Sequence, residues 1–490
     1  MLLDFTLPQV WAGLVFTLDL IIRIGAIFIV PRNRRPTSGM AWLLAIFFMP
    51  FIGTILFLVI GSRRLPKSRR RKQAEVDRLI ADISARAATV EEVRPDIHDP
   101  ALFNVVSLSK NLGALSLVGH NTATLHRDYV ESIEQMAQAV REAEHYVHVQ
   151  FYIFSFDKTT KDFFQAMQDA VARGVKVRVL LDYIASIRTA GNSKTIKQFE
   201  RIGVQWSYML PVRPWRGEYQ RPDLRNHRKL LVVDGRVGFM GSQNMIDDSY
   251  NKKSNIRRGL HWRDLMTRLE GPVVYGLNAV FLSDWYAETN ELITDWAHQA
   301  PQVPKGGKLQ CQIVPSGPGF VGENNLQMFV SLLYSARNRI SITSPYFVPD
   351  ESILYALIAA TARGVEVELF VSEIGDQALV FHAQRSYYEE ILRAGVRIFM
   401  YKPPYILHSK HFTIDDHIAV IGSSNMDQRS FSLNMEVSMM VHGKSFVKDL
   451  DGITDYYREN SRELTLGEWM KQPLRSTLLD NLARLTSALQ

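Results

Sequence analysis

Two copies of one residue pattern, each able to place an imidazole beside an ammonium group, dominate the sequence. The first copy contains His227, Lys229, Asp234, Gly241, Ser242 and Asn244, and the second contains His408, Lys410, Asp415, Gly422, Ser423 and Asn425. Every spacing agrees between the copies, with four residues between Lys and Asp and six between Asp and Gly. A register of six fixed residue types that occurs twice indicates a duplicated half. It predicts that each half brings one histidine to a shared centre.

Each copy is predicted to form a β-hairpin. "NHRKLLVVDGRVGFMGSQN" indicates a strand, a turn at Asp234-Gly235 and a return strand, and "LHSKHFTIDDHIAVIGSSN" repeats this with a turn at Asp415-Asp416. Because side chains alternate along a strand, the His and the Lys of each motif point the same way, whereas His411 points to the other face. The segment around His408 is therefore not read as a metal cluster.

The two hairpins together offer two imidazoles, two ammonium groups and the two carboxamides of Asn244 and Asn425. This set suits a phosphodiester, because lysines and asparagines can hold its non-bridging oxygens and stabilise the transition-state charge with no metal or other cofactor. One imidazole can attack phosphorus while the other protonates the leaving oxygen and later deprotonates the acceptor. The histidines should titrate as a coupled pair, so a bell-shaped pH profile is expected.

Other motif residues are candidates for supporting roles. A nucleophilic histidine needs an acceptor for its outer ring nitrogen, and Asp264 and Glu436, each seven residues before a glycine, are the predicted acceptors. Surface carboxylates on a strand are the alternative for these two. The motif aspartates Asp234 and Asp415 count among the catalytic candidates, although a hairpin turn favours Asp for backbone reasons. The motif serines Ser242 and Ser423 could donate to phosphate or tighten the turn.

The duplication extends beyond the motifs and predicts an α/β fold. "ARGVKVRVLL" at 172–181 returns as "ARGVEVELFV" at 362–371, each a helix that ends at glycine before a β-branched strand. Alternation of helix and strand predicts mixed or mostly parallel sheets, in two homologous halves packed face to face. The expected parts are a connector at 63–120, a first half at 121–300 (motif 227–244), a linker at 301–308, and a second half at 309–490 (motif 408–425) with a C-terminal helix.

The N-terminus reads as a membrane segment. Residues 11–30 and 41–60 are two apolar runs of the length that spans a bilayer, and Asp19 can pair with Arg23 one helical turn away. Two transmembrane helices within 1–62 are therefore expected. A cleaved signal peptide, for the first run, and buried soluble helices are the alternatives.

Charges beside these runs predict the topology. Three arginines lie between the runs, and seven basic residues follow the second run at 63–72. The larger group favours a cytoplasmic position for everything after it, and it could also bind anionic headgroups. The three loop arginines oppose a simple two-span hairpin, so a hairpin that spans imperfectly, with both ends cytoplasmic, stays open.

Composition sets wider limits. The 490 residues allow two or three domains, and the formal net charge of +7 suits a partner that carries phosphate without separating nucleic acid from membrane. The single cysteine, Cys311, excludes an intramolecular disulfide.

Taken together, these motifs resemble those of the phospholipase D superfamily, and more narrowly those of bacterial cardiolipin synthases. The likeness includes both H-x-K-x4-D motifs, "WRDLMTRLEGP", "SPYFVPD" and "IGSSNMDQRSFSLNMEV". It implies transfer of a phosphatidyl group between two phosphatidylglycerol molecules, with release of glycerol and a phosphohistidine intermediate. By family analogy His227 would be the nucleophile and His408 the acid and base, an order that the residues alone leave open. The resemblance also implies the bacterial inner membrane as location and anionic phospholipids, not nucleic acid, as partners.

Three competing functions remain at this point. A membrane-tethered phospholipase D would use water or another alcohol as acceptor, with the same chemistry up to the phosphohistidine. A nuclease is disfavoured, because nothing in the chain tracks a nucleic-acid backbone. A non-catalytic lipid-binding scaffold is disfavoured, because both motifs are complete.

Overall fold

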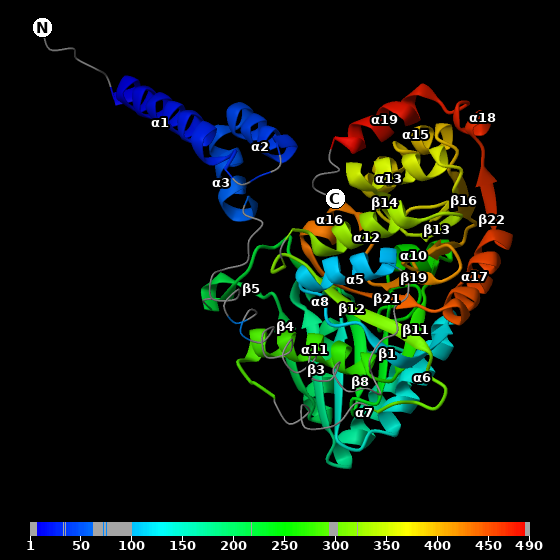
Figure 1. Cartoon of the computed structure of the whole chain (residues 1–490). Helices are drawn as coiled ribbons and strands as arrows, with labels where there is room; N and C mark the ends of the chain where they lie inside the picture. Colours follow the sequence, from blue (N-terminus) through cyan, green and yellow to red (C-terminus); the bar gives the residue numbers. More distant parts are fainter. Residues whose placement is uncertain are drawn as a thin grey trace, which may run out of the picture. The chain divides into compact units, whose positions relative to one another are not determined.

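The computed structural model describes residues 7–32, 34, 36–61, 72, 75, 100–216, 218–293, 302–320 and 322–485. The chain divides into two compact units, residues 1–64 with 221–223, and residues 65–220 with 224–490. Figure 1 shows the elements of both units. The predicted basic stretch at 63–71 and most of the predicted connector lie outside the described residues.

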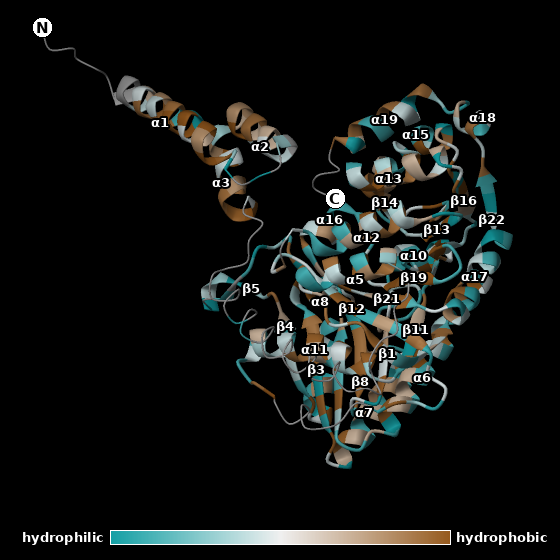
Figure 2. Cartoon of the chain, in the orientation of Figure 1, coloured by the Kyte–Doolittle hydropathy of each residue, from teal (hydrophilic) through white to brown (hydrophobic). Residues whose placement is uncertain are grey.

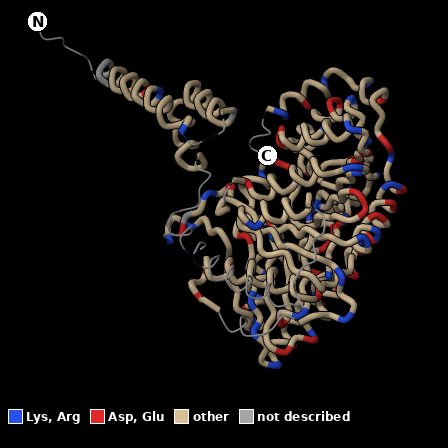
Figure 3. The backbone as a smooth tube through the Cα atoms, in the orientation of Figure 1, with Lys and Arg blue, Asp and Glu red and all other residues tan. Residues whose placement is uncertain are grey.

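The N-terminal unit contains three apolar helices, α1 (Leu7–Ile29), α2 (Pro36–Phe48) and α3 (Pro50–Ile60). Few of their residues are Lys, Arg, Asp or Glu (Figure 3). Among the described residues, one helix is long and apolar enough to cross a membrane, at Trp11–Ile29. The expected second span at 41–60 is divided into two helices, because Met49 leaves the helical conformation (φ −135°, ψ 72°) and Pro50, which has no N–H, starts a new helix.

The helices α2 and α3 fold back on each other at this break. A Cβ atom on Gly53 would lie 2.6 Å from the carbonyl oxygen of Ala45, so only glycine permits this approach. The rings of Trp42 and Phe57 meet edge to face at 5.5 Å. At 13 and 11 residues, each helix is shorter than the roughly 20 residues that a span requires. The two form a short helical hairpin.

The second unit is built on one mixed sheet of 16 strands (Figure 1). Its first half contains β1 (Val118–His126), α6 (Tyr129–Arg141), β2 (Tyr146–Phe151), α7 (Lys161–Ala172), β3 (Lys176–Asp182), α8 (Tyr183–Arg188), α9 (Asn192–Ile202), β4 (Gln205–Met209), β5 (Val212–Arg213), η2 (Pro214–Arg216), β6 (Glu218–Tyr219), β7 (Arg225–Asn226), β8 (Lys229–Val233), β9 (Val237–Gly241), α10 (Lys253–Arg258), β10 (His261–Arg263), β11 (Met266–Glu270) and α11 (Val273–Thr289).

The helix α5 (Pro100–Asn111) precedes this half and packs on the next one. The second half contains β12 (Leu309–Ser316), α12 (Asn324–Ser335), β13 (Arg339–Thr343), β14 (Phe347–Val348), α13 (Glu351–Ala362), β15 (Glu366–Ser372), α14 (Ala378–Arg385), α15 (Tyr388–Arg393), β16 (Arg397–Tyr401), β17 (Tyr405–Leu407), β18 (His411–Ile414), β19 (Ile418–Gly422), β20 (Met426–Asp427), α16 (Gln428–Ser432), β21 (Asn434–His442), α17 (Lys444–Glu459), β22 (Ser461–Leu464), α18 (Leu466–Trp469) and α19 (Leu474–Arg484).

The strand order is β22-β16-β15-β13-β18-β19-β21-β12-β1-β11-β9-β8-β2-β3-β4, with β7 paired to β21. Parallel pairing within this sheet is confined to β2-β3-β4 and β13-β15-β16 and, off the main path, to β7–β21. The predicted α/β class is confirmed, and the sheet is mixed because the two motif hairpins, β8–β9 and β18–β19, add antiparallel strands.

The two halves meet in two ways. Antiparallel pairing of β1 with β12 joins their sheets edge to edge, an arrangement that the expectation of face-to-face packing did not include. At the motif ends, β7 pairs with β21 and β10 pairs with β17, so each half supplies a short strand to the other. One apolar cluster contains buried residues of both halves, among them Leu230, Met240, Ile421 and Val437. The halves therefore share a core behind the motifs.

Candidate active site

The two motif histidines are positioned by backbone pairing across the two halves. His227 follows β7, and its N–H donates to the carbonyl oxygen of Met435 at 2.8 Å. His408 follows β17, and its N–H donates to the carbonyl oxygen of Arg263 at 2.7 Å. Each histidine thus starts from a strand that is hydrogen-bonded to the opposite half. The structure brings both to the boundary between the halves.

Each imidazole contacts a carboxylate of the other half. His227 Nδ1 lies 2.9 and 3.0 Å from the two carboxylate oxygens of Glu436, and His408 Nδ1 lies 2.7 Å from Asp264 Oδ1. Both carboxylates are fully buried. A carboxylate that accepts from Nδ1–H leaves Nε2 as the nitrogen available for chemistry. The residues predicted as orienting carboxylates lie in that position, crossed between the halves.

The motif serines hold these carboxylates. Ser242 Oγ donates to Asp264 Oδ1 at 2.6 Å, and Ser423 Oγ donates to Glu436 Oε2 at 2.5 Å. Each hydroxyl also accepts a backbone N–H, from Leu265 and from Val437, at 3.0 Å. Because both serine hydroxyls are used in this way, they position the carboxylates that orient the histidines.

The motif lysines are buried beside the histidines. Lys229 Nζ donates to the carbonyl oxygen of His227 at 2.5 Å, and Lys410 Nζ donates to that of His408 at 2.6 Å. Lys410 Nζ also lies 3.1 Å from His408 Nε2. Each lysine is thus held beside the histidine of its own motif, where its ammonium group can bind the oxygens of a phosphate group.

The motif asparagines occupy unequal environments. Asn244 Nδ2 donates to the hydroxyl of Tyr250 at 2.8 Å, and Asn244 Oδ1 accepts the N–H of Ile153 at 3.2 Å. Asn425 is buried, and its Oδ1 has no hydrogen-bond partner among the described residues. The ring of Tyr250 lies 6.4 Å from that of His408, so the Asn244 pair adjoins the histidine of the other half.

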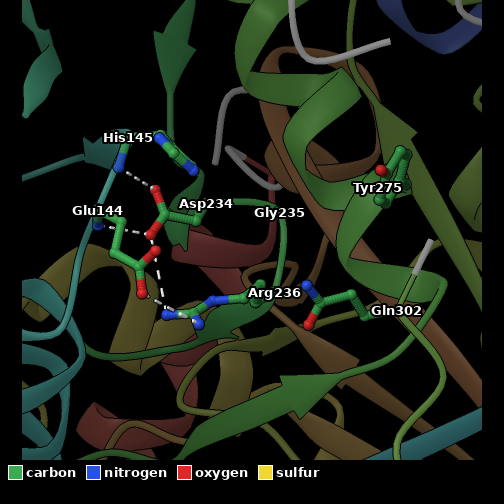
Figure 4. A pocket seen from close by; sticks show the side chains of 7 residues that line it. All are labelled: Glu144, His145, Asp234, Gly235, Arg236, Tyr275 and Gln302. Atoms are coloured by element: carbon green, nitrogen blue, oxygen red, sulfur yellow. Dashed lines mark hydrogen bonds and ion pairs between the residues drawn. The ribbon is translucent and has the colours of Figure 1, made fainter. Parts of the chain in front are cut away.

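The motif aspartates lie away from the histidines, at the far ends of β8 and β18. Asp234 has φ 53° and accepts from the N–H groups of Glu144, His145 and Tyr146 at 2.7–2.9 Å. Figure 4 shows it in an open pocket of about 300 Å³ lined by Glu144, His145, Asp234, Gly235, Arg236, Tyr275 and Gln302.

Asp415 repeats this geometry in the second half. It has φ 52° and accepts from the N–H groups of Arg337, Asn338 and Arg339. Each aspartate therefore fastens its hairpin turn to the start of the neighbouring strand. This position assigns both residues to the scaffold and removes them from the catalytic candidates.

Burial and neighbouring charges shift the titration of the site. Burial, with Lys229 and Lys410 nearby, holds the pKa of His227 well below its ordinary value. Burial raises the pKa of Glu436 to about 7. In the other pair, burial lowers the pKa of His408 despite Asp264.

The remaining groups shift in different directions. Burial alone would raise the pKa of Asp264, but His408, Lys410 and the Ser242 hydroxyl together bring it below its usual value. Burial lowers the pKa of Lys410 to about 8 and that of Lys229 well below its ordinary value. A neutral His227 is the form that can attack phosphorus.

Arg228, between the His and Lys of the first motif, supports the site in a way that the sequence motifs do not predict. Its Nε donates to the carbonyl oxygen of Glu436 at 3.0 Å, one NH2 group donates to the carbonyl oxygen of Ser316 at 3.3 Å, and it pairs with buried Asp284. Strand alternation alone places Arg228 on the face opposite to His227, but it does not predict which residues Arg228 contacts there. Arg228 ties the two halves together directly behind the site.

A narrow cleft lies near His408. Its cavity volume is about 10 Å³, room for about one water molecule, and its lining includes Tyr346, Asp376, Gln377 and Ile406. The Tyr346 hydroxyl donates to the Asp376 carboxylate at 3.0 Å and accepts from Gln377 Nε2 at 3.0 Å. The ring of Tyr346 lies 6.5 Å from that of His408. Tyr346 therefore links the Asp376 carboxylate to the surroundings of the second histidine.

Among the described residues, no group of three or more His, Cys, Asp or Glu side chains is placed to hold a metal ion.

Two homologous α/β halves with crossed histidine–carboxylate pairs define a phospholipase D-like enzyme. The family profile described as "Cardiolipin synthase, PLD-like domain" matches residues 136–270 and 329–456, and a "Phospholipase_D-nuclease N-terminal" profile matches residues 21–62. The chain belongs to the cardiolipin synthase family with PLD-like domains.

Relatives and a solved structure agree with this assignment. The cardiolipin synthase of Alkalihalophilus pseudofirmus is 33% identical over 97% of this chain and 93% of its own length. Cardiolipin synthase A of Proteus mirabilis is 30% identical over 99% of both chains. The phosphatidylserine synthase structure from Haemophilus influenzae covers 78% of this chain and 99% of its own, with a TM-score of 0.60 and 14% identity, a likeness of fold alone.

Proposed function

We propose that this chain is a membrane-bound phosphatidyltransferase that makes cardiolipin and glycerol from two phosphatidylglycerol molecules. The observation that carries the proposal is the pair of imidazoles, each held at Nδ1 by a carboxylate of the other half and each flanked by a buried lysine. The membership of the cardiolipin synthase family supports the substrate class.

In the first step His227 Nε2 attacks phosphorus of the donor lipid. The bond from phosphorus to the glycerol oxygen breaks, and His408 gives its proton to that oxygen, so glycerol leaves and a phosphatidyl-histidine remains. Glu436 accepts the Nδ1–H of His227 and stabilises the positive charge that develops on the ring. Lys229 and Lys410 stabilise the charge on the phosphoryl oxygens.

In the second step the terminal hydroxyl of the acceptor lipid occupies the place that glycerol has left. Neutral His408 takes the hydroxyl proton, the oxygen attacks phosphorus, and the bond from phosphorus to His227 Nε2 breaks. Cardiolipin forms, and both histidines return to their starting protonation states. One base therefore serves both steps, which requires leaving and attacking oxygens on the same side of the phosphorus.

We propose that Asp376 helps to select a glycerol-bearing acceptor over water. Its carboxylate can accept a hydrogen bond from a glycerol hydroxyl, and it is held by Tyr346, whose ring lies 6.5 Å from that of His408. The cleft of about 10 Å³ must widen to admit a headgroup. A glycerol headgroup carries such hydroxyls both when it leaves and when it attacks.

Hydrolysis to phosphatidic acid is the second candidate, since the first step is shared. Purified protein given only phosphatidylglycerol distinguishes the two. Cardiolipin with an equal amount of glycerol is expected. Phosphatidic acid as the main product would assign a phospholipase D activity, and no turnover with a correctly folded protein would leave a lipid-binding scaffold.

For the membrane unit, we infer that α1 crosses the bacterial inner membrane once, and that the α2–α3 hairpin enters the cytoplasmic leaflet and returns. The Arg34 side chain donates to the carbonyl oxygen of Gly61 and lies 4.6 Å from the centroid of the Phe57 ring. The start of α2 and the end of α3 are therefore neighbours. In this arrangement the loop arginines and the basic stretch at 63–72 are both cytoplasmic, as is the catalytic unit. The loop arginines then no longer oppose the topology that the basic stretch predicts.

Cysteine accessibility tests this topology, because the native Cys311 is buried. In intact spheroplasts, Ser38→Cys should resist a membrane-impermeant maleimide and react only after permeabilisation, as should the control Gln165→Cys on α7. Reaction of Ser38→Cys alone in intact spheroplasts would assign two full spans instead.

A further inference from the structure

The C-terminal helix α19 packs against the catalytic unit through its polar face. Asp480 is buried and accepts from His382 Nδ1 at 2.6 Å and from Arg385 Nε at 3.2 Å, both on α14. Near the other end, Arg484 pairs with Glu390 of α15 at 3.2 Å. These ion pairs and the buried Ala483 fasten the helix to the unit, at the periphery of the fold (Figure 1).

The leucines of α19 point to the outside. All four of them, and Leu485 directly after the helix, are between 52% and 87% exposed, namely Leu474, Leu478, Leu479, Leu482 and Leu485. Leu474, Leu478 and Leu482 are spaced by four residues, so they line one face, on the side opposite to Asp480. Figure 2 shows apolar and polar residues interleaved along α19. A surface helix normally buries such a stripe. Here the usual arrangement is inverted, and a continuous apolar stripe of this kind marks an interaction site.

The charges around the stripe select its occupant. Lys471 and Arg475 are exposed, and Arg475 lies among the leucines. On a lipid surface the leucines would enter the acyl boundary while Arg475 extends to an anionic headgroup. In a contact between two copies, Arg475 would be buried opposite another Arg475 or leucines, at a high desolvation cost. The basic, leucine-faced helix fits an anionic bilayer.

We propose that the outward face of α19 lies on the membrane surface as a second, interfacial attachment of the catalytic unit. It rests on the proposed function in one respect, that the substrates are bilayer lipids. Together with α1, it would attach the unit at two places and restrict how the unit can tilt over the bilayer. Because the attachment is tested by depth rather than by turnover, it can fail while the proposed reaction stands.

Site-directed spin labels on the full chain in vesicles containing phosphatidylglycerol test the proposal. Labels at Leu478→Cys and Leu482→Cys should be relaxed by oxygen and protected from a water-soluble nickel complex, which indicates burial in lipid. A label at the exposed Gln165→Cys on α7, drawn at the other end of the unit in Figure 1, should show the reverse. In vesicles of zwitterionic lipid alone, the α19 labels should lie less deep, because Lys471 and Arg475 lose their anionic partners.

Two outcomes would overturn the proposal. Nickel accessibility at both α19 positions equal to that at Gln165 would mean that the helix lies in water. Protection from both relaxation agents, with short label-to-label distances between copies, would assign the face to a second copy of the chain.

Two double variants that add acidic residues to α19 test the proposal by enzymatic turnover. Leu478→Asp/Leu482→Asp places two acidic groups in the stripe, where little packing is lost because both side chains are more than half exposed. Turnover should fall several-fold on vesicles and stay unchanged on detergent micelles. The matched control Thr477→Asp/Asn481→Asp adds the same charges at the same spacing on the flank of the helix. Equal turnover of the two double variants on vesicles would contradict the attachment.

Discussion

His227 Nδ1 lies 2.9 Å from Glu436 Oε1, although 209 residues separate the two along the chain. The second pair, His408 with Asp264, crosses the boundary in the opposite direction. Each half therefore holds one histidine and the carboxylate that orients the other. Neither half contains a complete catalytic pair, so the two halves must fold together before either histidine is set for reaction.

The pH dependence of turnover should follow from the charge of this pair. The pKa of Glu436 is about 7, and its ionised form is needed to accept Nδ1–H and keep Nε2 of His227 free. Below about pH 7 the protonated acid would donate to Nδ1 instead, so kcat/KM should fall as the pH drops. The pKa of Lys410 is about 8, and its charge is lost above that value. A bell-shaped profile is expected, with an acid limb near 7 from Glu436. Its alkaline limb combines loss of the His408 proton that the first step uses, since the pKa of His408 lies below its ordinary value, with loss of the Lys410 charge.

Glu436→Gln tests the assignment of the acid limb. The amide oxygen can still accept Nδ1–H, but the charge is gone, so kcat should fall at least about 100-fold. The limb near pH 7 should also move to a much lower pH, because the remaining group, His227, has a pKa held well below its ordinary value. Asp264→Asn is the control, since the pKa of Asp264 is already low and its loss should not move that limb. An unchanged limb in Glu436→Gln would refute the assignment.

Replacing either histidine should stop the reaction, for different reasons. His227→Ala removes the nucleophile, so no phosphatidyl group should bind to the protein. His408→Ala keeps the nucleophile and removes the acid and base, so a lipid with a good leaving group should load His227 and remain there. Rapid acid-labile labelling of His408→Ala, and none of His227→Ala, is expected from protein quenched with radiolabelled lipid. Label on His408 in the His227→Ala protein would reverse the two roles.

Arg228 should matter to stability more than its surface-exposed counterparts do. Arg228→Met would leave buried Asp284 without its cationic partner and remove two hydrogen bonds across the halves. A loss of about 3–5 kcal/mol of unfolding free energy is expected. Arg236→Met is the control, because Arg236 is partly exposed and lies 3.8 Å or more from its acidic partners, so it should cost less than about 0.5 kcal/mol. Equal melting temperatures for Arg228→Met and Arg236→Met would contradict a stabilising role of Arg228 between the two halves.

Residue types and spacing predicted much of this site, and tertiary contacts decided the rest. The hairpins, the histidine and lysine pairs and the α/β class follow from local periodicity. The crossing of the carboxylates could not be predicted, because spacing within one half does not say which half a carboxylate faces. The return of α3 onto α2 after the break at Pro50 depends on the approach of Gly53 to Ala45, a contact between helices that an apolar run does not reveal.

Removal of divalent ions should leave turnover intact. Lys229 and Lys410 lie beside the histidines and can supply the positive charge that the phosphoryl oxygens need. Activity on detergent-solubilised lipid is therefore expected to be the same with and without EDTA. Stimulation by Mg²⁺ on anionic vesicles would reflect screening of the lipid surface. Loss of micelle turnover with EDTA, restored by one specific ion, would contradict this role of the lysines.

Asp376 should decide between lipid acceptor and water. The Tyr346 hydroxyl donates to this carboxylate, and the Tyr346 ring lies 6.5 Å from that of His408. In the proposed reaction the glycerol of either substrate reaches this carboxylate. Asp376→Asn keeps the shape and removes the charge, so a glycerol hydroxyl would lose a strong acceptor worth about 1.5–3 kcal/mol, or roughly 10- to 150-fold in acceptor binding. Loading of His227 from a donor with a non-glycerol leaving group should change little, because that step does not use the pocket. The ratio of cardiolipin to phosphatidic acid should then fall, with a rise in the KM for phosphatidylglycerol.

Gln377→Ala is the matched control, since it only removes a donor to Tyr346 and should shift the ratio less. An unchanged product ratio in Asp376→Asn would show that acceptor choice is made elsewhere in the site.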